Sequence, residues 1–229
     1  MNTEKISIIM PVLNEAKVLR NTLNNLKLSG NEELIIVDGG SSDDTLSIAR
    51  EFSENVFETK TGRASVMNYG AKKATGDILL FLHADCILPD SGLKTIRKTL
   101  RKDNISAGGF YLGIDHPKTV YRIIEFGANL RSVVASLVYG DQGIFLKKDT
   151  FTRVGGFTEI PLMEDIELSI KLKKLGKIAL VRPPMKSSPR RWLEEGALYS
   201  TLRDWSIAFS YSFLGISPEK LFRYYKDVR

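Results

Sequence analysis

Short apolar runs alternate with longer stretches of helical periodicity through the first hundred residues. The runs at 34–38 and 78–82 are rich in branched residues and too short for helices, which predicts buried strands. Apolar residues at Val18, Leu19 and Leu23 instead follow the spacing of one helix face. Strands are predicted at 6–12, 34–38, 55–60 and 78–82, and helices at 16–28, 45–52 and 62–76. Because strands separated by helices pair in parallel, we expect an α/β fold with a mostly parallel central sheet flanked by helices.

The pattern becomes less regular after residue 104. Strands are predicted at 106–113, 143–147 and 177–181, and helices at 120–138, 149–154 and 166–175. Two further helices from residue 194 onward are interrupted at Gly215 and Pro218. We therefore expect a nucleotide-binding α/β half at 1–104, a second half at 105–192, and a helical C-terminal extension at 193–229.

Composition narrows the class of protein. The chain has 229 residues, 43% of them hydrophobic, and a net charge of +6, which suits a globular protein with anionic partners such as nucleotides or an acidic membrane surface. Zinc-knuckle spacings and RNA-binding aromatic runs are missing from the sequence, so no nucleic-acid partner is expected.

The single cysteine, Cys86, fits a reducing compartment, and packing is its favoured role over that of a nucleophile. With no signal peptide and no apolar run near the about 20 residues of a membrane span, a cytoplasmic location is expected.

Carboxylates occur where strands end or helices begin. Asp38 and Asp85 close predicted strands, and in parallel sheets ligands bind at the carboxyl ends of strands. Asp85 could hold a divalent cation shared with substrate phosphates, or it could cap a following helix. Glu164 and Asp165 open a helix whose dipole keeps such groups ionised, either as simple helix stabilisation or ready to accept a proton.

Arginines complement these carboxylates. Arg63 follows Gly62 at a helix start, where it could meet a phosphate. Arg190, Arg191 and Trp192 follow a proline-rich stretch, which predicts a loop over the site, with a solvated basic loop as the alternative. The sequence lacks the glycine fingerprints of dehydrogenases and P-loop enzymes.

The ordered motifs at 10–15, 36–45, 62–64, 81–85, 155–157 and 163–165 resemble those of family 2 glycosyltransferases of the GT-A fold, the nucleotide-diphospho-sugar transferase fold. The resemblance covers roughly residues 5–192. The segment from 188 to 229 further resembles a small bacterial subgroup associated with radical-SAM and selenodomain proteins.

This resemblance implies inverting transfer of a sugar from a nucleoside diphosphate sugar, with UDP favoured, to an unidentified hydroxyl acceptor, assisted by Mn²⁺ or Mg²⁺. Asp165 would be the general base beside Glu164, and Asp85 would bind the metal. The implied nucleotide-binding residues are Pro11, Asn14, Glu15, Asp38, Arg63, Asp85 and Arg191. The second half, 105–192, would be the acceptor half, and the implied acceptor-binding residues are Asp141, Gln142 and Trp192.

Two positions depart from the family pattern. His83 replaces the first aspartate of the Asp-x-Asp motif, so the metal would rest on Asp85 with the imidazole, which favours Mn²⁺. Ser188 stands where processive members carry glutamine, so a non-processive hexosyltransferase is expected. These departures leave open a non-catalytic nucleotide-sugar-binding or scaffold protein, and a nucleotidyltransferase is a weaker alternative.

The C-terminal extension combines aromatic residues with basic ones, including Arg203, Lys220, Arg223, Lys226 and Arg229. Such a segment could contact the inner face of a membrane peripherally, pack on the sheet, or form a homodimer.

Overall fold

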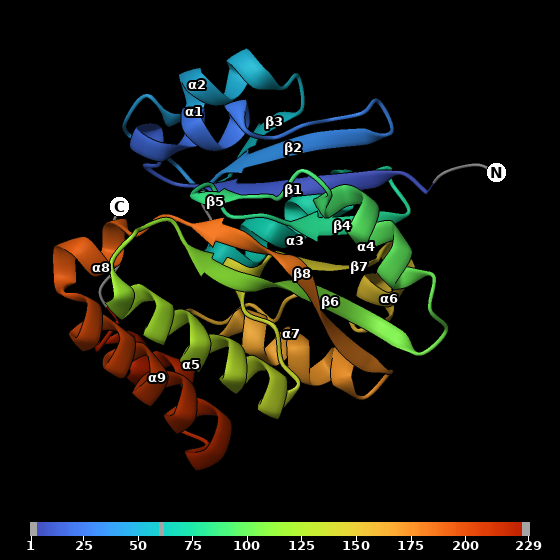
Figure 1. The fold of residues 1–229 in the computed structure, drawn as a ribbon. Helices are drawn as coiled ribbons and strands as arrows, with labels where there is room; N and C mark the ends of the chain where they lie inside the picture. Colours follow the sequence, from blue (N-terminus) through green and yellow to red (C-terminus); the bar gives the residue numbers. More distant parts are fainter. Residues whose placement is uncertain (1–3, 60–61, 226–229) are drawn as a thin grey trace.

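The computed structural model describes residues 4–59 and 62–225. In this described part of the chain, eight strands form one sheet in the order β3-β2-β1-β4-β7-β6-β8-β5 (Figure 1). The strands are β1 (Ile6–Val12), β2 (Glu32–Asp38), β3 (Val56–Glu58), β4 (Ile78–Phe81), β5 (Cys86–Ile87), β6 (Ile105–Ile114), β7 (Ile144–Lys147) and β8 (Lys177–Ser187). The helices are α1 (Ala16–Asn24), α2 (Thr45–Phe52), α3 (Arg63–Lys73), α4 (Gly92–Leu100), α5 (Thr119–Ala135), the 3₁₀ helix η1 (Gly140–Gln142), α6 (Lys148–Arg153), α7 (Glu164–Lys173), α8 (Arg190–Glu195), α9 (Ala197–Leu214) and α10 (Pro218–Phe222).

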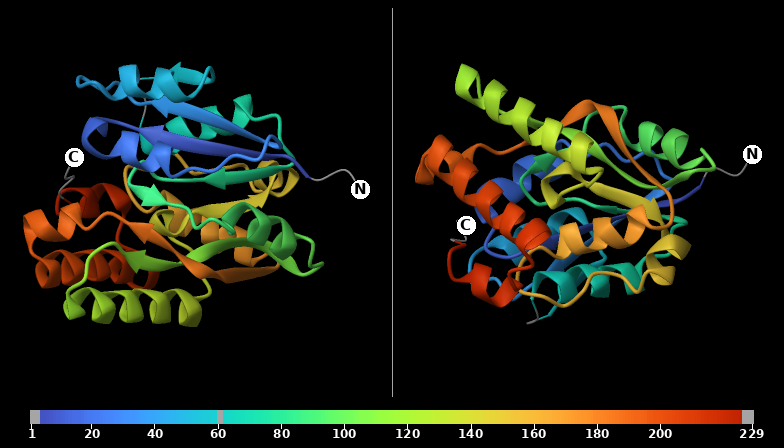
Figure 2. Two further views of the ribbon diagram at one scale, coloured as in Figure 1. Left: turned by 45° about the horizontal axis from the view of Figure 1, so that its top comes forward. Right: turned by 90° about the horizontal axis from the view of Figure 1, so that it is seen from below.

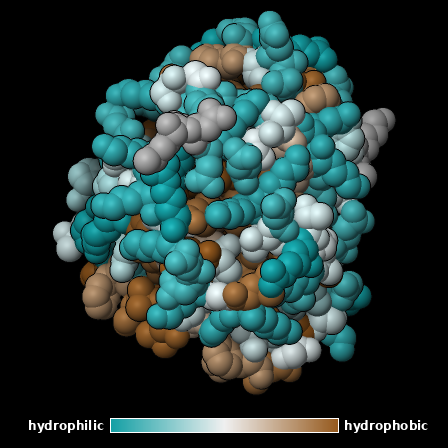
Figure 3. Space-filling model, turned by 90° about the vertical axis from the view of Figure 1, so that its right-hand side faces the viewer, coloured by the Kyte–Doolittle hydropathy of each residue, from teal (hydrophilic) through white to brown (hydrophobic). Residues whose placement is uncertain are grey.

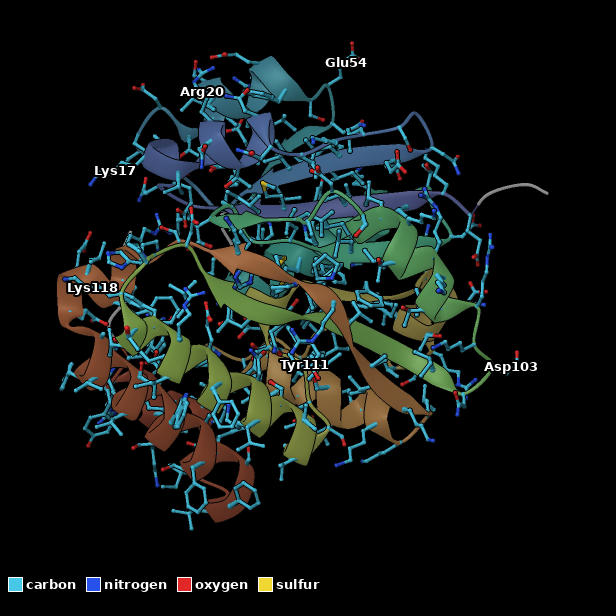
Figure 4. The ribbon with its side chains drawn as sticks, in the orientation of Figure 1. Lys17, Arg20, Glu54, Asp103, Tyr111 and Lys118 are labelled. Atoms are coloured by element: carbon cyan, nitrogen blue, oxygen red, sulfur yellow. The ribbon has the colours of Figure 1, made fainter. Side chains whose placement is uncertain are left out.

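The N-terminal half of the sheet is parallel. Strand β1 pairs in parallel with β2 and β4, so that Ile8 lies opposite Leu34 and Leu80. These strands read as nearly continuous apolar runs because helices cover both of their faces. Residues of α1, α2 and α4 pack on one face, and residues of α3, α6 and α7 pack on the other. On α1, Lys17 and Arg20 project outward (Figure 4), whereas Leu19 and Leu23 are buried.

The second half of the sheet contains both parallel and antiparallel strand pairs. Strand β7 pairs antiparallel with β4 and β6, β6 and β8 pair in parallel, and the short β5 pairs antiparallel with β8. Parallel pairs predominate over the whole sheet, which confirms the predicted mostly parallel arrangement.

Three segments differ from the sequence prediction. Helix α1 ends at Asn24 instead of residue 28, and β8 runs on to Ser187 instead of ending at residue 181. Strand β8 tolerates Pro183 and Pro184 because its register against β6 shifts between Phe110 and Leu112, so the missing N–H groups fall at an irregularity. Residues 190–192 begin helix α8, directly after Pro189 at its N-cap, and are not the loop that was predicted.

Other predicted boundaries hold within a few residues. Residue 60, the predicted end of the third strand, and residues 226–229 of the extension, including Lys226 and Arg229, lie outside the described residues. Asp85 is followed by strand β5 and not by a helix, so the helix-cap alternative for Asp85 is wrong.

Helices α5 and α9 run side by side along one side of the molecule, far from α1 and α2 (Figures 1 and 2). They approach closely at Gly127, where an added Cβ would lie 2.3 Å from Cη2 of Trp205. None of the helices in residues 4–59 and 62–225 combines the length and the apolar character needed to cross a membrane.

Candidate active site

A cavity of about 540 Å³ opens at the carboxyl ends of β1 and β4. Helices α5, α7, α8 and α9 complete its walls. Most of the residues implied by the sequence line this cavity, namely Pro11, Glu15, Arg63, His83, Asp85, Asp141, Glu164, Asp165, Arg191 and Trp192. Side chains from strand ends more than 150 positions apart along the chain therefore meet in one place, as expected for the carboxyl edge of such a sheet.

Asn14, Asp38 and Gln142 lie behind this lining. The Asp38 carboxylate is 2% exposed and accepts hydrogen bonds of 2.9 Å from the backbone amides of Gly40 and Ser41. Asn14 adopts a positive φ of 54° and its Oδ1 accepts a bond of 2.8 Å from the Ser42 amide. These two side chains order the turns after β1 and β2, which brings Gly39 to the cavity wall.

Gln142 has the same kind of role on the opposite wall. Its Oε1 accepts hydrogen bonds from the Ser132 hydroxyl and the Tyr139 amide, at 3.1 and 3.0 Å. The side chain is buried and holds η1 against α5, so its polar atoms face the protein.

Arg190 is the arginine that meets the carboxylates of the strand ends. Its Nη1 forms an ion pair of 2.6 Å with Oε2 of Glu15, and its Nη2 lies 3.6 Å from Oδ2 of Asp85. Sequence reasoning chose Arg191 for the phosphate site, whereas Arg191 pairs with Asp204 and donates a bond of 2.8 Å to the Tyr225 hydroxyl. The pair of adjacent arginines was visible in the sequence, but the direction of each side chain depends on the helix that begins at Arg190.

Arg63 connects His83 to Glu164. Its Nη2 contacts the imidazole Nε2, and its Nε lies 3.2 Å from Oε1 of the buried Glu164. Loss of solvent around the imidazole, together with the guanidinium groups of Arg63 and Arg190, lowers the pKa of His83 well below its ordinary value. Burial raises the pKa of Glu164, Arg63 opposes that shift, and the charge of Asp165 adds to it. Because its own pKa is lowered in this way, His83 is a neutral imidazole at physiological pH.

Asp165 stands at the first turn of α7, and backbone amides fix both of its oxygens. Oδ2 accepts a bond of 2.8 Å from Gly140 and Oδ1 accepts one of 2.7 Å from Ile166. The nearby Asp141 has its pKa raised by burial, an effect that Arg131 opposes and the charge of Asp165 reinforces. A carboxylate held by two amides and a helix N-terminus, with free lone pairs toward the cavity, is suited to accept a proton from a bound hydroxyl.

Arg131 and Tyr139 also line the cavity, and neither was predicted from the sequence as a site residue. The Arg131 guanidinium stacks on the Tyr139 ring at 3.9 Å and lies 5.7 Å from the Trp205 ring. The only sequence signal was that Arg131 is the one charged residue between positions 126 and 138.

Comparison with known proteins identifies the family. The glycosyl transferase family 2 profile matches residues 7–158, which is more than half of the chain. The chain belongs to glycosyltransferase family 2. A PGL/p-HBAD biosynthesis glycosyltransferase of Mycobacterium tuberculosis is 44% identical over 94 residues, covering 37% of each chain. A poly-beta-1,6-N-acetyl-D-glucosamine synthase of Staphylococcus epidermidis is 26% identical over 188 residues, covering 74% of this chain and 46% of that protein.

Two solved structures share the fold of this family 2 chain. The mannosyltransferase PcManGT from Pyrobaculum calidifontis, in complex with GDP-Man and Mn²⁺, superposes with a TM-score of 0.65 at 22% identity, covering 80% of this chain and 56% of that one. S. aureus TarS 1-349 in complex with UDP-GlcNAc gives a TM-score of 0.65 at 17% identity, covering 96% of this chain and 70% of that one. The α/β sheet and its helices are thus a GT-A-like fold, as the sequence indicated.

The chain spans well under half the length of the curated relatives that it matches, between 32% and 46%. Similarity to these family 2 proteins therefore concerns the shared domain.

A divalent cation, implied by the family resemblance, can be tested against the donor atoms near Asp85. One ligand atom each from His83, Asp85 and Cys86 lies within 4.8 Å of the others. Burial, with the charges of Asp85 and Asp141, raises the pKa of the Cys86 thiol well above its ordinary value, so this sulfur stays protonated and is a poor ligand. A neutral imidazole and a carboxylate remain, and this pair fits a borderline cation such as Mn²⁺ better than Mg²⁺.

Proposed function

We propose that the protein is an inverting, metal-dependent glycosyltransferase that moves a sugar from a UDP sugar to a hydroxyl acceptor. The single observation that carries the proposal is that Asp85, Arg190 and Asp165 line one cavity at the carboxyl edge of the sheet. The resemblance to a structure holding UDP-GlcNAc and to one holding GDP-Man and Mn²⁺ supports a nucleotide-sugar donor.

The donor's nucleoside would lie against Pro11, Glu15 and Gly39, on the loops that Asn14 and Asp38 order. Its diphosphate would meet the guanidinium groups of Arg63 and Arg190, which are planar and well matched to phosphate oxygens. This proposal keeps nucleotide binding within residues 1–104, where the sequence predicts it, and adds Arg190 from the second half.

His83 and Asp85 would hold the cation, which when bound supplies positive charge beside the diphosphate. Arg63 and Arg190 stabilise the negative charge that develops on the departing nucleoside diphosphate. Asp165 accepts the proton of the acceptor hydroxyl as that oxygen attacks the anomeric carbon from the face opposite the leaving group. A single displacement of this kind inverts the anomeric configuration. Glu164 keeps Arg63 in place through its ion pair.

The acceptor would occupy the part of the cavity lined by Asp141 and Trp192, in the half formed by residues 105–192. Gln142 would support that wall from behind through its bond to the Tyr139 amide. We further propose transfer of a single hexose per encounter, because Ser188 replaces the glutamine of processive members. The cytoplasmic location, the homodimer and the radical-SAM-associated subgroup stay predictions from the sequence.

The test is a thermal-shift panel of UDP and GDP sugars with Mn²⁺, with Mg²⁺ and with EDTA, because a ligand that binds the native state raises its stability by about 2.7 kcal/mol at one hundred times its Kd. We expect a UDP sugar with Mn²⁺ to give the largest shift. Incubation of that donor with candidate alcohols should then yield free UDP and an adduct one hexose heavier, measured by mass spectrometry.

The alternative is a non-catalytic nucleotide-sugar-binding or scaffold protein, which His83 in place of aspartate favours. Such a protein would bind the donor in the panel and yet release no UDP, either by transfer or by slow hydrolysis. No stabilisation by any nucleotide sugar would contradict both functions.

A further inference from the structure

Helices α5 and α9 present a broad apolar surface on the outside of the molecule. Phe126 and Val134 of α5 are 70% and 76% exposed, and Phe213 of α9 is 73% exposed and stacks on Phe209 at 5.0 Å. Hydrophobic residues gather along the lower edge of the molecule in Figure 3, the edge along which α5 and α9 run in Figure 1. We define the α5–α9 face by its exposed apolar side chains, which are Ile123, Phe126, Leu130, Val133, Val134, Leu198, Tyr199, Leu202, Phe209, Phe213 and Leu214.

The α5–α9 face carries few charges. The remaining exposed residues of the two helices are Thr119, Arg122 and Ser206, and Arg122 forms an ion pair of 2.9 Å with Glu125. Lys118 precedes α5 at the edge of the molecule (Figure 4), and Lys220 and Arg223 are exposed on and after α10. The acidic residues Asp115, Glu194 and Glu219 are also exposed next to these helices. An apolar surface with charged residues and exposed tyrosines at its edges has the composition of a protein that lies in a lipid–water interface.

The inner sides of the same helices line the cavity. Ile124 and Ala128 of α5 and Trp205, Ile207 and Ala208 of α9 form apolar parts of its wall. Arg131 of α5 and Asp204 of α9 are the charged side chains that these two helices add to the lining. Contact between the two helices at Gly127 and Trp205 keeps the α5–α9 face and this apolar wall within one helix thickness of each other.

We propose that the α5–α9 face docks on an anionic lipid bilayer, and that the apolar wall of the cavity receives the hydrocarbon part of an alcohol drawn from that bilayer. The second half of this statement rests on the proposed function and specifies its acceptor as an amphiphile. The polar end of such a molecule would point toward Asp165, and its chain toward Trp205.

A second copy of this chain fits the surface less well than lipid. In a two-fold symmetric dimer the same patch forms both sides, so two copies that each carry a net charge of +6 would be brought together. Anionic head groups instead complement Arg122, Lys118 and the net charge of +6.

The docking is tested by flotation of the full chain with phosphatidylcholine vesicles, with and without phosphatidylglycerol. We expect binding to the anionic vesicles that weakens as salt is raised. Phe126→Glu and Phe213→Glu should each lower the partition coefficient roughly tenfold, because an apolar ring is lost from the interface and a negative charge added. The matched control is Leu28→Glu, which makes the same charge change at a residue 45% exposed in the distant N-terminal half. It should change partition by less than about twofold.

Equal losses for all three variants, or no binding of the wild type to anionic vesicles, would overturn the docking. So would sedimentation velocity showing a wild-type dimer that Phe126→Glu converts to monomer while vesicles leave the wild type in solution. Circular dichroism melts of each variant show whether it is folded before flotation is compared.

The amphiphile site has its own readout, because the two tryptophans of the chain, Trp192 and Trp205, both line the cavity. We expect 11-bromoundecanol to quench their fluorescence saturably, and 2-bromoethanol, which lacks the chain, to quench only by collision. The Phe126→Glu variant should be quenched like the wild type, since its change lies on the outer face. Quenching by the two bromides in proportion to concentration alone would overturn the site. Neither vesicle flotation nor fluorescence quenching uses a donor sugar. Either result can therefore contradict this inference while sugar transfer to another acceptor succeeds.

Discussion

The backbone amide of Gly140 donates a hydrogen bond of 2.8 Å to Oδ2 of Asp165. Gly140 also lies against His83, the proposed metal ligand, because an added Cβ at Gly140 would be 2.6 Å from the His83 ring. One short helix, η1, thus fixes the distance between the proposed base at the start of α7 and the proposed metal ligand after β4.

Asp165→Asn is expected to lower kcat by about 10²–10⁴-fold, because the amide cannot take the acceptor's proton. The Kd for UDP should change little, since the side chain keeps its shape and its bond from Gly140. Turnover is measured by UDP release and affinity by calorimetry. Asp149→Asn, an exposed aspartate in the first turn of α6, is the control and should retain activity. Wild-type turnover in Asp165→Asn would refute the assignment of the base.

Asp85→Asn should weaken UDP binding roughly tenfold in Mn²⁺, a change of about 1.4 kcal/mol, because a carboxylate ligand is lost from the cation. In EDTA the variant and the wild type should bind UDP with more similar affinity. Calorimetric titrations in both buffers give the comparison. Equal loss with and without the metal would assign Asp85 to holding Arg190 instead.

Arg190→Ala should mainly weaken UDP binding, whereas Arg191→Ala should mainly lower the stability of the fold. Removing Arg190 deletes a charged partner for the diphosphate and should raise the Kd for UDP by about 10- to 100-fold. Removing Arg191 breaks its contacts with Asp204 and Tyr225 and should lower the free energy of unfolding by about 1–3 kcal/mol, with a smaller effect on UDP. Urea unfolding and calorimetry are measured on both variants. The reverse pattern would favour Arg191, the residue predicted from the sequence, as the phosphate ligand.

Glu33 should give the protein a measurable acid sensitivity. Burial opposes its ionisation, but hydrogen bonds from Ser7, Thr75 and Lys5 outweigh burial and lower the pKa of Glu33 to about 2. Since the folded-state pKa lies below the unfolded one, this stabilisation is present above about pH 4.5 and is lost as the pH falls toward 2.

Glu33→Gln should therefore lower the free energy of unfolding by about 2 kcal/mol at pH 7 and by clearly less near pH 3. Urea unfolding at the two pH values is the measurement, with Glu51→Gln, on the exposed pair with Arg20, as the control. A loss that is the same at both pH values would mean that packing, and not charge, explains the effect.

The sequence by itself determined the order of most strands and helices, but not β5, α4 and η1, and it determined the positions of the family motifs. Apolar runs such as 78–82 are local patterns, and a strand buried on both faces must be apolar throughout. The family resemblance also implied that Asp85 and Asp165 belong to one site, and both side chains line the same cavity.

Only the tertiary structure decided which of two neighbouring arginines meets the carboxylates and what covers each face of a helix. Arg190 and Arg191 differ by one position, and the turn of α8 sends the first to Glu15 and the second to Asp204. Asp38 turned inward because three nearby donors satisfy its carboxylate. Phe126 is exposed and Ile124 faces the cavity because α5 packs on Trp205 of α9, which lies more than 75 residues later in the chain. Such contacts depend on long-range packing, which no local sequence pattern specifies.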